Sequence, residues 1–141
     1  MSELRDFVEI LRAAGEITRL RLLALLAEGE LSVKDLTEIL DQSQPRVSRH
    51  LRVLTESGLI ARHAEGAWAF FRLSDEDSAM ALVQHLLSQL DRNDIVLSAD
   101  MARLEAVRKD HQMRAASYFS KVAKDWDRLR SLHAPDSAVE A

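Results

Sequence analysis

Arginine, glutamine and serine side chains are concentrated between residues 43 and 52 of this 141-residue sequence. At helical spacing Val47, Leu51 and Leu54 share one face, which suits burial. The opposite face then presents five polar side chains: Gln44, Arg46, Ser48, Arg49 and Arg52. Glutamine and arginine can each make paired hydrogen bonds to base edges in the major groove, and serine and the free N–H groups of a first helical turn suit phosphate. The pattern predicts a helix that contacts DNA.

The charge distribution supports this prediction although the net charge is −4. Residues 42–73 carry five arginines and two glutamates, a local net charge of +3, whereas residues 1–41 carry −4 and residues 74–141 carry −3. Affinity for DNA depends on the cations of the contacted face, because these displace the counterions of the phosphates. The acidic average therefore does not exclude a DNA partner.

Helical periodicity predicts the elements that would position this face. We expect helices over residues 3–13 and 17–27, and a third helix capped by Ser32 in a capping-box arrangement. After a three-residue break, a fourth helix begins at the Ser43 cap and ends at Gly58.

Two strands are predicted next, over residues 59–63 and 67–73, which form a hairpin around Gly66. A further helix starts at residues 74–77, and a long helix extends from about Ser98 to about His133.

Two short helices joined by a three-residue turn and followed by a hairpin form a winged helix-turn-helix. We therefore predict a mainly α fold with a β-hairpin wing (α+β), dimeric, with a long C-terminal helix. The expected organisation is a DNA-binding and dimerisation domain over residues 1–95, a helical arm over 96–134, and a flexible tail over 135–141.

Several spaced segments within residues 3–95 resemble the ArsR/SmtB family of bacterial transcriptional repressors. These are TRLRLL at 18–23, LSVKDL at 31–36, SQPRVSRHLRVL at 43–54 and the Glu65–Gly66 wing. The resemblance implies a homodimer held by the first and last family helices, and repression relieved by an inducer. It also implies DNA contacts at the positions that match the family's Ser-Gln and Ser-Arg-His motifs, here Ser43, Gln44, Ser48, Arg49 and His50.

The expected roles are as follows. Gln44, Arg46 and Arg49 contact bases; phosphate contacts come from Thr18, Arg19, Ser43, Ser48, Arg52 and Arg62; His50 and His63 are further DNA-contact candidates. The expected dimer interface comprises Leu4, Phe7, Leu11, Leu86, Leu90, Leu104, Val107, Tyr118 and Phe119.

The sequence departs from the family at its known sensor positions. Metal-sensing members carry a Cys-Val-Cys element where this chain has Ser32 and Lys34, which are poor ligands for soft metals. The family's other metal motif is not matched by residues 77–79 and 85–88, and the chain contains no cysteine. We therefore predict neither a metal site nor thiol sensing.

The C-terminal residues resemble a second group of proteins. Tyr118, Phe119 and residues 126–133 are similar to the connector that joins an ArsR domain to an S-adenosylmethionine-dependent methyltransferase domain. A methyltransferase needs a glycine-rich strand-to-helix turn, and no glycine follows Gly66, so we predict that this chain is not an enzyme and holds no cofactor. S-adenosylmethionine or S-adenosylhomocysteine would be a ligand only of a larger parent protein.

Two functional hypotheses follow. The first is a cytoplasmic homodimeric repressor that binds an inverted-repeat double-stranded DNA operator and is released by a non-metal inducer of unknown identity, with no membrane partner. The second is the regulatory or dimerising segment of a larger methyltransferase protein, with weak or no DNA binding. The chain itself is either the N-terminal part of such a protein or a stand-alone regulator with a long arm.

Overall fold

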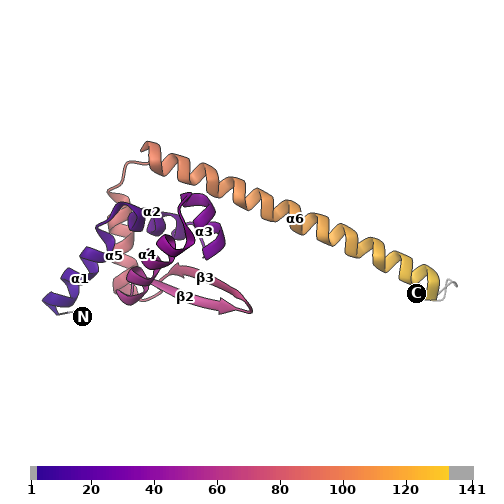
Figure 1. The fold of residues 1–141 in the computed structure, drawn as a ribbon, viewed down its shortest axis with the longest axis horizontal. Coiled ribbons are helices and arrows are strands. Elements are labelled where there is room, and N and C mark those ends of the chain that lie inside the picture. The colour runs from indigo at the N-terminus through magenta and orange to yellow at the C-terminus, as the bar shows by residue number, and fades with distance from the viewer. Residues whose placement is uncertain (1–2, 134–141) are drawn as a thin grey trace. The chain divides into compact units, whose positions relative to one another are not determined.

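The computed structural model describes the backbone of residues 3–133 and the side chains of residues 3–129, in two compact units that meet between Leu104 and Glu105 (Figure 1). The elements are α1 (Leu4–Ala14), α2 (Ile17–Leu26), β1 (Leu31–Ser32), α3 (Val33–Leu40), α4 (Gln44–Glu56), β2 (Ile60–Glu65), β3 (Trp68–Leu73), α5 (Asp77–Ser88) and α6 (Ile95–His133). The predicted winged helix-turn-helix order of helices and hairpin is confirmed.

The core of the first unit, which we call the winged unit, is built from leucines of α2, α3 and α4. Leu22, Leu36 and Leu51 are completely or almost completely buried, as are Val47 and Leu54 on the same face of α4. The helices are apolar on the faces where they meet, so their burial positions α4 with its polar face outward.

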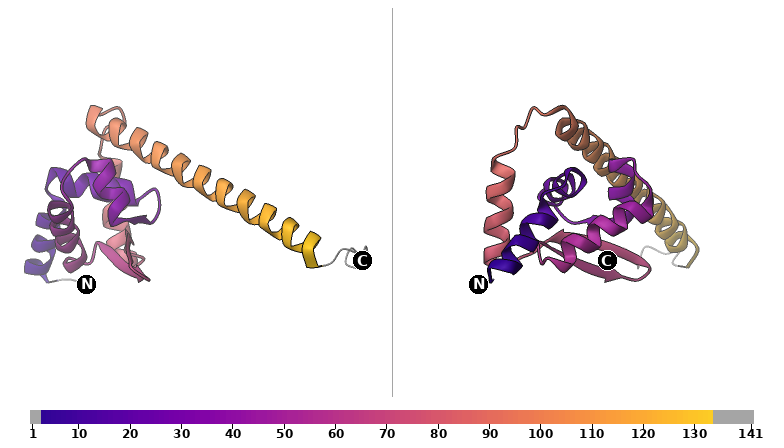
Figure 2. Two further views of the ribbon diagram at one scale, coloured as in Figure 1. Left: turned by 45° about the vertical axis from the view of Figure 1, so that its right-hand side comes forward. Right: turned by 60° about the vertical axis from the view of Figure 1, so that its left-hand side comes forward.

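The hairpin belongs to a three-stranded antiparallel sheet with the order β1-β3-β2. Strand β1 is too short to be recognised from periodicity, and it pairs Leu31 with Phe71. The two-residue hairpin turn places Gly66 at a φ of 60°, the left-handed region that the first position of a type II′ turn requires. Helix α4 lies beside this hairpin in the views of Figure 2 and contacts β2.

Helix α6 begins three residues before the expected start at Ser98. The side chain of Asp94 accepts hydrogen bonds from the N–H groups of Val96 (2.9 Å) and Leu97 (3.1 Å), which caps the helix at this earlier point. The winged unit consequently extends beyond the expected boundary at residue 95 and includes the first turns of α6 up to Leu104.

A buried ion pair anchors these first turns of α6 to α2. The guanidinium of Arg21 donates two hydrogen bonds of 2.8 Å to the carboxylate of Asp100, which is 1% exposed. This bidentate contact holds the pKa of Arg21 above its ordinary value. Arg103 adds a hydrogen bond of 3.0 Å to the carbonyl oxygen of Ile39 at the end of α3.

One residue expected at the dimer interface is instead buried within the winged unit. Leu104 is 3% exposed, so it offers no surface to a second subunit. Periodicity placed it correctly on the apolar face of the long helix, but it could not distinguish burial within the chain from burial between chains.

The second unit, which we call the arm, comprises the remainder of α6 from Glu105. The long predicted helix is confirmed to its end at His133, and the predicted tail over 135–141 lies outside the described residues. No helix within the described residues is long and apolar enough to cross a membrane.

Candidate nucleic-acid interface

The turn between α3 and α4 is fixed by three consecutive polar residues. Asp41 adopts a left-handed conformation with a φ of 54°, and its N–H donates to the carbonyl of Thr37 (3.0 Å). The side-chain amide of Gln42 donates to the hydroxyl of Thr18 on α2 (3.3 Å), and the Ser43 hydroxyl accepts a hydrogen bond from the N–H of Arg46 (3.4 Å). These contacts orient the first turn of α4 relative to the core.

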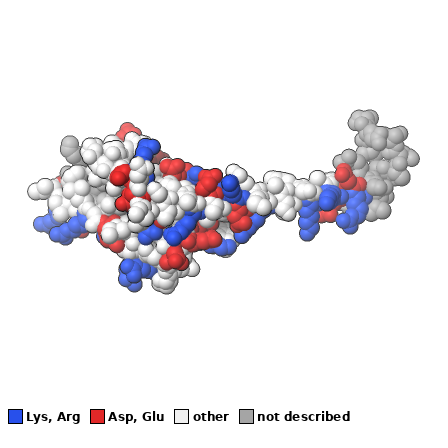
Figure 3. All heavy atoms as spheres, turned by 90° about the horizontal axis from the view of Figure 1, so that it is seen from above, with Lys and Arg blue, Asp and Glu red and all other residues white. Residues whose placement is uncertain are grey.

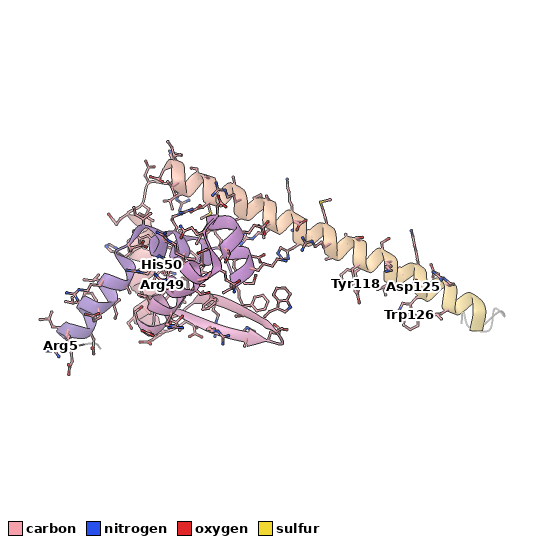
Figure 4. The ribbon with its side chains drawn as sticks, viewed as in Figure 1. Arg5, Arg49, His50, Tyr118, Asp125 and Trp126 are labelled. Atoms are coloured by element: carbon pink, nitrogen blue, oxygen red, sulfur yellow. The ribbon has the colours of Figure 1, made fainter. Side chains whose placement is uncertain are left out.

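The polar face of α4 is open to solvent as predicted. Gln44, Arg46, Arg49 and Arg52 are exposed and Ser48 is half-buried. Figure 4 labels Arg49 and His50 on this helix. The exposed N-terminal half of α4 therefore carries donors that suit both base edges and phosphates.

One flank of this face lines a groove of about 550 Å³ between α4 and the wing. Gln44, Ser48 and Arg52 line it from α4, and Arg62 lines it from β2. Arg62 pairs across the hairpin with Phe71, which is why it points to the same side of the sheet as the core. The groove brings arginines from two elements together across an open space.

Lys34 and Trp68 also line the groove, near the tip of the wing, and the sequence pattern indicated neither as part of the interface. The Lys34 ammonium lies 5.9 Å from the centre of the Trp68 ring, a cation–π distance. Trp68 remains 54% exposed. Its position beside a predicted wing tip was visible in the sequence, but the approach of Lys34 on α3 was not.

The other flank of α4 is occupied by His50. The guanidinium of Arg19 donates to the Nδ1 atom of His50 (3.1 Å), and Glu16 Oε1 lies 3.9 Å from the same atom. Burial lowers the pKa of His50, and the charges of Arg19, Arg46 and Arg49 act in the same direction, while Glu16 opposes them. The imidazole is therefore held neutral, with Nδ1 as an acceptor.

Two of the residues predicted to contact phosphate make hydrogen bonds within the fold. Thr18 is 4% exposed and its hydroxyl is bonded to Gln42. Arg19 donates to the carbonyl oxygens of Ala13 (2.5 Å) and Arg12 (3.2 Å) as well as to His50. Both side chains therefore join helices together. Buried Thr18 is not available to a phosphate, which corrects the expectation for this residue, whereas Arg19 is half-buried and its phosphate contact stays a prediction.

His63 is exposed on the outer part of the wing and lies 3.4 Å from a carboxylate oxygen of Glu30. The neighbouring acid makes this side of the wing less suited to phosphate than the side that carries Arg62.

Among the described residues, no group of three or more His, Asp or Glu side chains is placed to hold a metal ion.

Basic and acidic side chains are intermixed on the face of the molecule seen in Figure 3, and neither sign of charge dominates it.

On α1 the apolar residues expected at the dimer interface are exposed: Leu4 by 82%, Phe7 by 43% and Leu11 by 42%. Leu86 and Leu90, which were also expected at the dimer interface, are half-buried.

The winged unit is similar to known bacterial regulators. The family described as "Bacterial regulatory protein, arsR family" matches residues 17–62. The chain is 38% identical over 96 residues to the arsenic resistance transcriptional regulator ArsR1 of Pseudomonas putida KT2440, covering 67% of this chain and 74% of that protein. It is 45% identical over 75 residues to the arsenical resistance operon repressor of Escherichia coli K12, covering 52% of this chain and 64% of that repressor.

A solved structure shows the same fold. The homodimeric winged helix-turn-helix DNA-binding domain Mb0332 of Mycobacterium bovis, described as a possible ArsR-family transcriptional regulator, superposes with a TM-score of 0.58 at 23% identity. The match covers 64% of this chain and 83% of that domain. Together with the polar face of α4 and its wing, these similarities show that the chain belongs to the arsR family of bacterial regulatory proteins.

Proposed function

We propose that this chain is a DNA-binding transcriptional repressor that acts as a homodimer on an inverted-repeat operator. The observation that carries the proposal is the exposed face of α4, which is fixed by the Ser43 cap and by the burial of Val47, Leu51 and Leu54. Gln44, Arg46 and Arg49 are assigned to base edges in the major groove. These assignments accord with the names of the relatives, two of which are a repressor and a transcriptional regulator.

The phosphate contacts are assigned to the groove between α4 and the wing. Ser48, Arg52 and Arg62 line it together, and a phosphate backbone following it would be neutralised from both sides. Ser43 adds the N-terminus of α4, where free N–H groups and the helix dipole favour an anion. His50 is assigned to holding Arg19 and α4 together, with its Nε2 N–H left for a DNA contact.

The dimer is assigned to α1, whose exposed leucines and phenylalanine form an apolar strip on the winged unit. Such a strip is costly to leave in water and is typical of a subunit interface. The Mycobacterium bovis domain is described as homodimeric, which supports a dimer without specifying its interface. Leu86 of α5 and Leu90, which lies two residues beyond its end, are assigned to the same contact.

The inducer is not carried over from the relatives. Two of them are named for arsenic resistance, but these 141 residues contain no cysteine, and thiolates are the ligands that thiophilic elements prefer. We therefore propose a non-metal inducer. The similarity of the arm to a methyltransferase connector, and with it a role for S-adenosylmethionine in a larger protein, stays a prediction.

The proposal is tested by selecting bound duplexes from a randomised DNA library with the full chain. We expect an inverted repeat with half-site centres about one helical turn, or a small multiple of it, apart. Affinity for the selected duplex should fall steeply as salt rises, because phosphate contacts release counterions. Failure to enrich any sequence at low salt would contradict the proposal and favour a dimerising segment without DNA binding.

A further inference from the structure

The arm exposes a long apolar stripe in the single chain. Tyr118 is 65% exposed and Trp126 is 62% exposed. Phe119, next to the stripe, is 68% exposed, and its ring lies edge to face with that of Tyr118, with the two ring centroids 5.8 Å apart. The members of the stripe recur at spacings of three and four residues, which places them on one side of a helix: Ala115, Tyr118, Val122, Trp126 and Leu129. Aromatic side chains at this spacing indicate a helical partner.

Charged side chains border one edge of this stripe in two intrahelical pairs. Arg114 lies 2.8 Å from Asp110, and Arg128 lies 3.4 Å from Asp125. The order along the helix is acid then base in both pairs. All four side chains are more than half exposed, so both pairs are accessible to a second helix.

The two pairs are complementary only if a second copy runs in the opposite direction. An antiparallel partner whose midpoint lies between residues 119 and 120 sets Arg114 opposite the partner's Asp125. The same register brings Asp110 to within one residue of the partner's Arg128. A parallel partner would instead bring this edge of the helix against the other edge of its partner, so the two pairs would not meet each other.

The sizes of the stripe residues are compatible with an antiparallel arrangement. In the register that sets Arg114 against Asp125, Trp126, the largest side chain of the stripe, lies level with the partner's Met113 and two residues from the partner's Ala115, the smallest. Tyr118 lies one residue from the level of the partner's Val122. A parallel arrangement would oppose two tryptophans at one level and leave two alanines opposite each other at another, which packs poorly.

We propose that the arms of two copies of this chain pair antiparallel, in a register that sets Arg114 of each against Asp125 of the other. The occupant of the stripe is thus a second copy of the chain. This interface lies outside the α1 surface and does not depend on DNA binding, so it goes beyond the proposed repressor function.

The absence of cysteine in the sequence makes a spin-label measurement direct, because one introduced cysteine is the only attachment site. Ser120→Cys and Lys109→Cys both place a label on the side of the helix opposite the stripe. In the antiparallel register the axial separation between two copies grows by about 3 Å for each residue from the midpoint. It is therefore close to zero for Ser120 and about 32 Å for Lys109.

The measurement is made by pulsed dipolar spectroscopy on the full chain, at a concentration where sedimentation shows it to be associated. We expect a clearly longer distance for the Lys109 label than for the Ser120 label. Equal distances would overturn the antiparallel register. If the chain sediments as a dimer but neither label reports a distance, arm pairing is wrong while the dimer through α1 stands.

Charge reversal provides a second, independent test. Arg114→Glu and Asp125→Arg should each reduce the intermolecular dipolar signal severalfold, and the double variant should recover it because the attraction is restored with its signs exchanged. Lys109→Glu on the outer face is the matched control for Arg114→Glu, in an otherwise cysteine-free chain labelled at Ser120, and should leave the signal unchanged. Failure of the double variant to recover the signal would overturn the assigned register.

Discussion

In the winged unit Leu22, Leu36 and Leu51 are completely or almost completely buried, whereas in the arm Tyr118 and Trp126 are more than 60% exposed. Both units carry apolar side chains at helical spacing, and the sequence pattern alone does not distinguish those that are buried from those that are exposed. The difference is that α2, α3 and α4 find partners within the chain, while the arm consists of a single helix. The core of the winged unit is thus complete within one chain, whereas the apolar stripe of the arm has no partner helix within its own unit.

The ion pairs differ between the two units in the same way. The side chains of Arg21 and Asp100 are 14% and 1% exposed, whereas those of Arg114 and Asp110 are 67% and 55% exposed. A buried charge that loses its partner is strongly unfavourable, while an exposed pair adds little because water screens it. The first pair therefore holds the structure together, and the second is free to recognise another molecule.

The largest expected effect comes from breaking the buried pair. Asp100→Ala leaves the guanidinium of Arg21 without its two hydrogen bonds, and we expect the free energy of unfolding to fall by about 3–5 kcal/mol. Asp110→Ala in the arm is the matched control and should change it by at most about 1 kcal/mol. Urea denaturation measures both, and equal losses in the two variants would contradict the contrast between the units.

Substitutions on α4 should affect DNA binding and not stability. Arg49→Ala removes a contact assigned to a base, so we expect a loss of about 1–3 kcal/mol on the selected duplex and a relaxed preference at one base pair. Arg128→Ala removes the same charge from the arm and should leave the affinity unchanged. Competition in a gel-shift assay measures both; unchanged specificity for Arg49→Ala would remove it from the base-contacting set.

The groove arginine on the wing should behave differently. Arg62→Ala removes a contact assigned to phosphate, so we expect weaker binding to all duplexes alike and a slope of log affinity against log salt that is smaller by about 1. Titration by fluorescence anisotropy at several salt concentrations gives the slope. A loss of sequence preference with an unchanged slope would instead place Arg62 on a base.

The smallest expected effect concerns His50. Because burial lowers its pKa in the folded chain, the unfolded chain binds a proton first as the pH falls below about 6.5. Stability contributed by the neutral imidazole is present above this pH and is lost on acidification toward the folded pKa. Thermal unfolding between pH 5 and 7 should therefore depend less on pH in His50→Gln than in the unsubstituted chain.

The sequence predicted those parts of the winged unit that depend on neighbouring residues. Ser43 caps α4 and Val47 faces inward because both features follow from local spacing. The pair of Arg21 and Asp100 joins residues 79 apart, and the bond from Arg19 to His50 joins residues 31 apart. Periodicity contains no information on such contacts, which is why Arg19 was expected at a phosphate and is found within the fold.

The helix-turn-helix was predictable because its turn, cap and apolar face lie within about twenty residues. The groove between α4 and the wing was only partly predictable, because Lys34 and Trp68 reach it from separate elements. In the arm, the apolar stripe was recognised, but its side chains were expected at one interface together with Leu104, which is buried in the winged unit.

The central claim is that two copies of α4 contact DNA as a symmetric pair. Hydroxyl-radical footprinting of the full chain on the selected duplex tests it most directly. We predict two protected half-sites of equal extent, related by the two-fold axis of the repeat, with centres about one helical turn or a small multiple apart, and both should be lost together in the Arg46→Ala, Arg49→Ala double variant. A single unpaired footprint, or a symmetric footprint that survives the double substitution, would contradict the account.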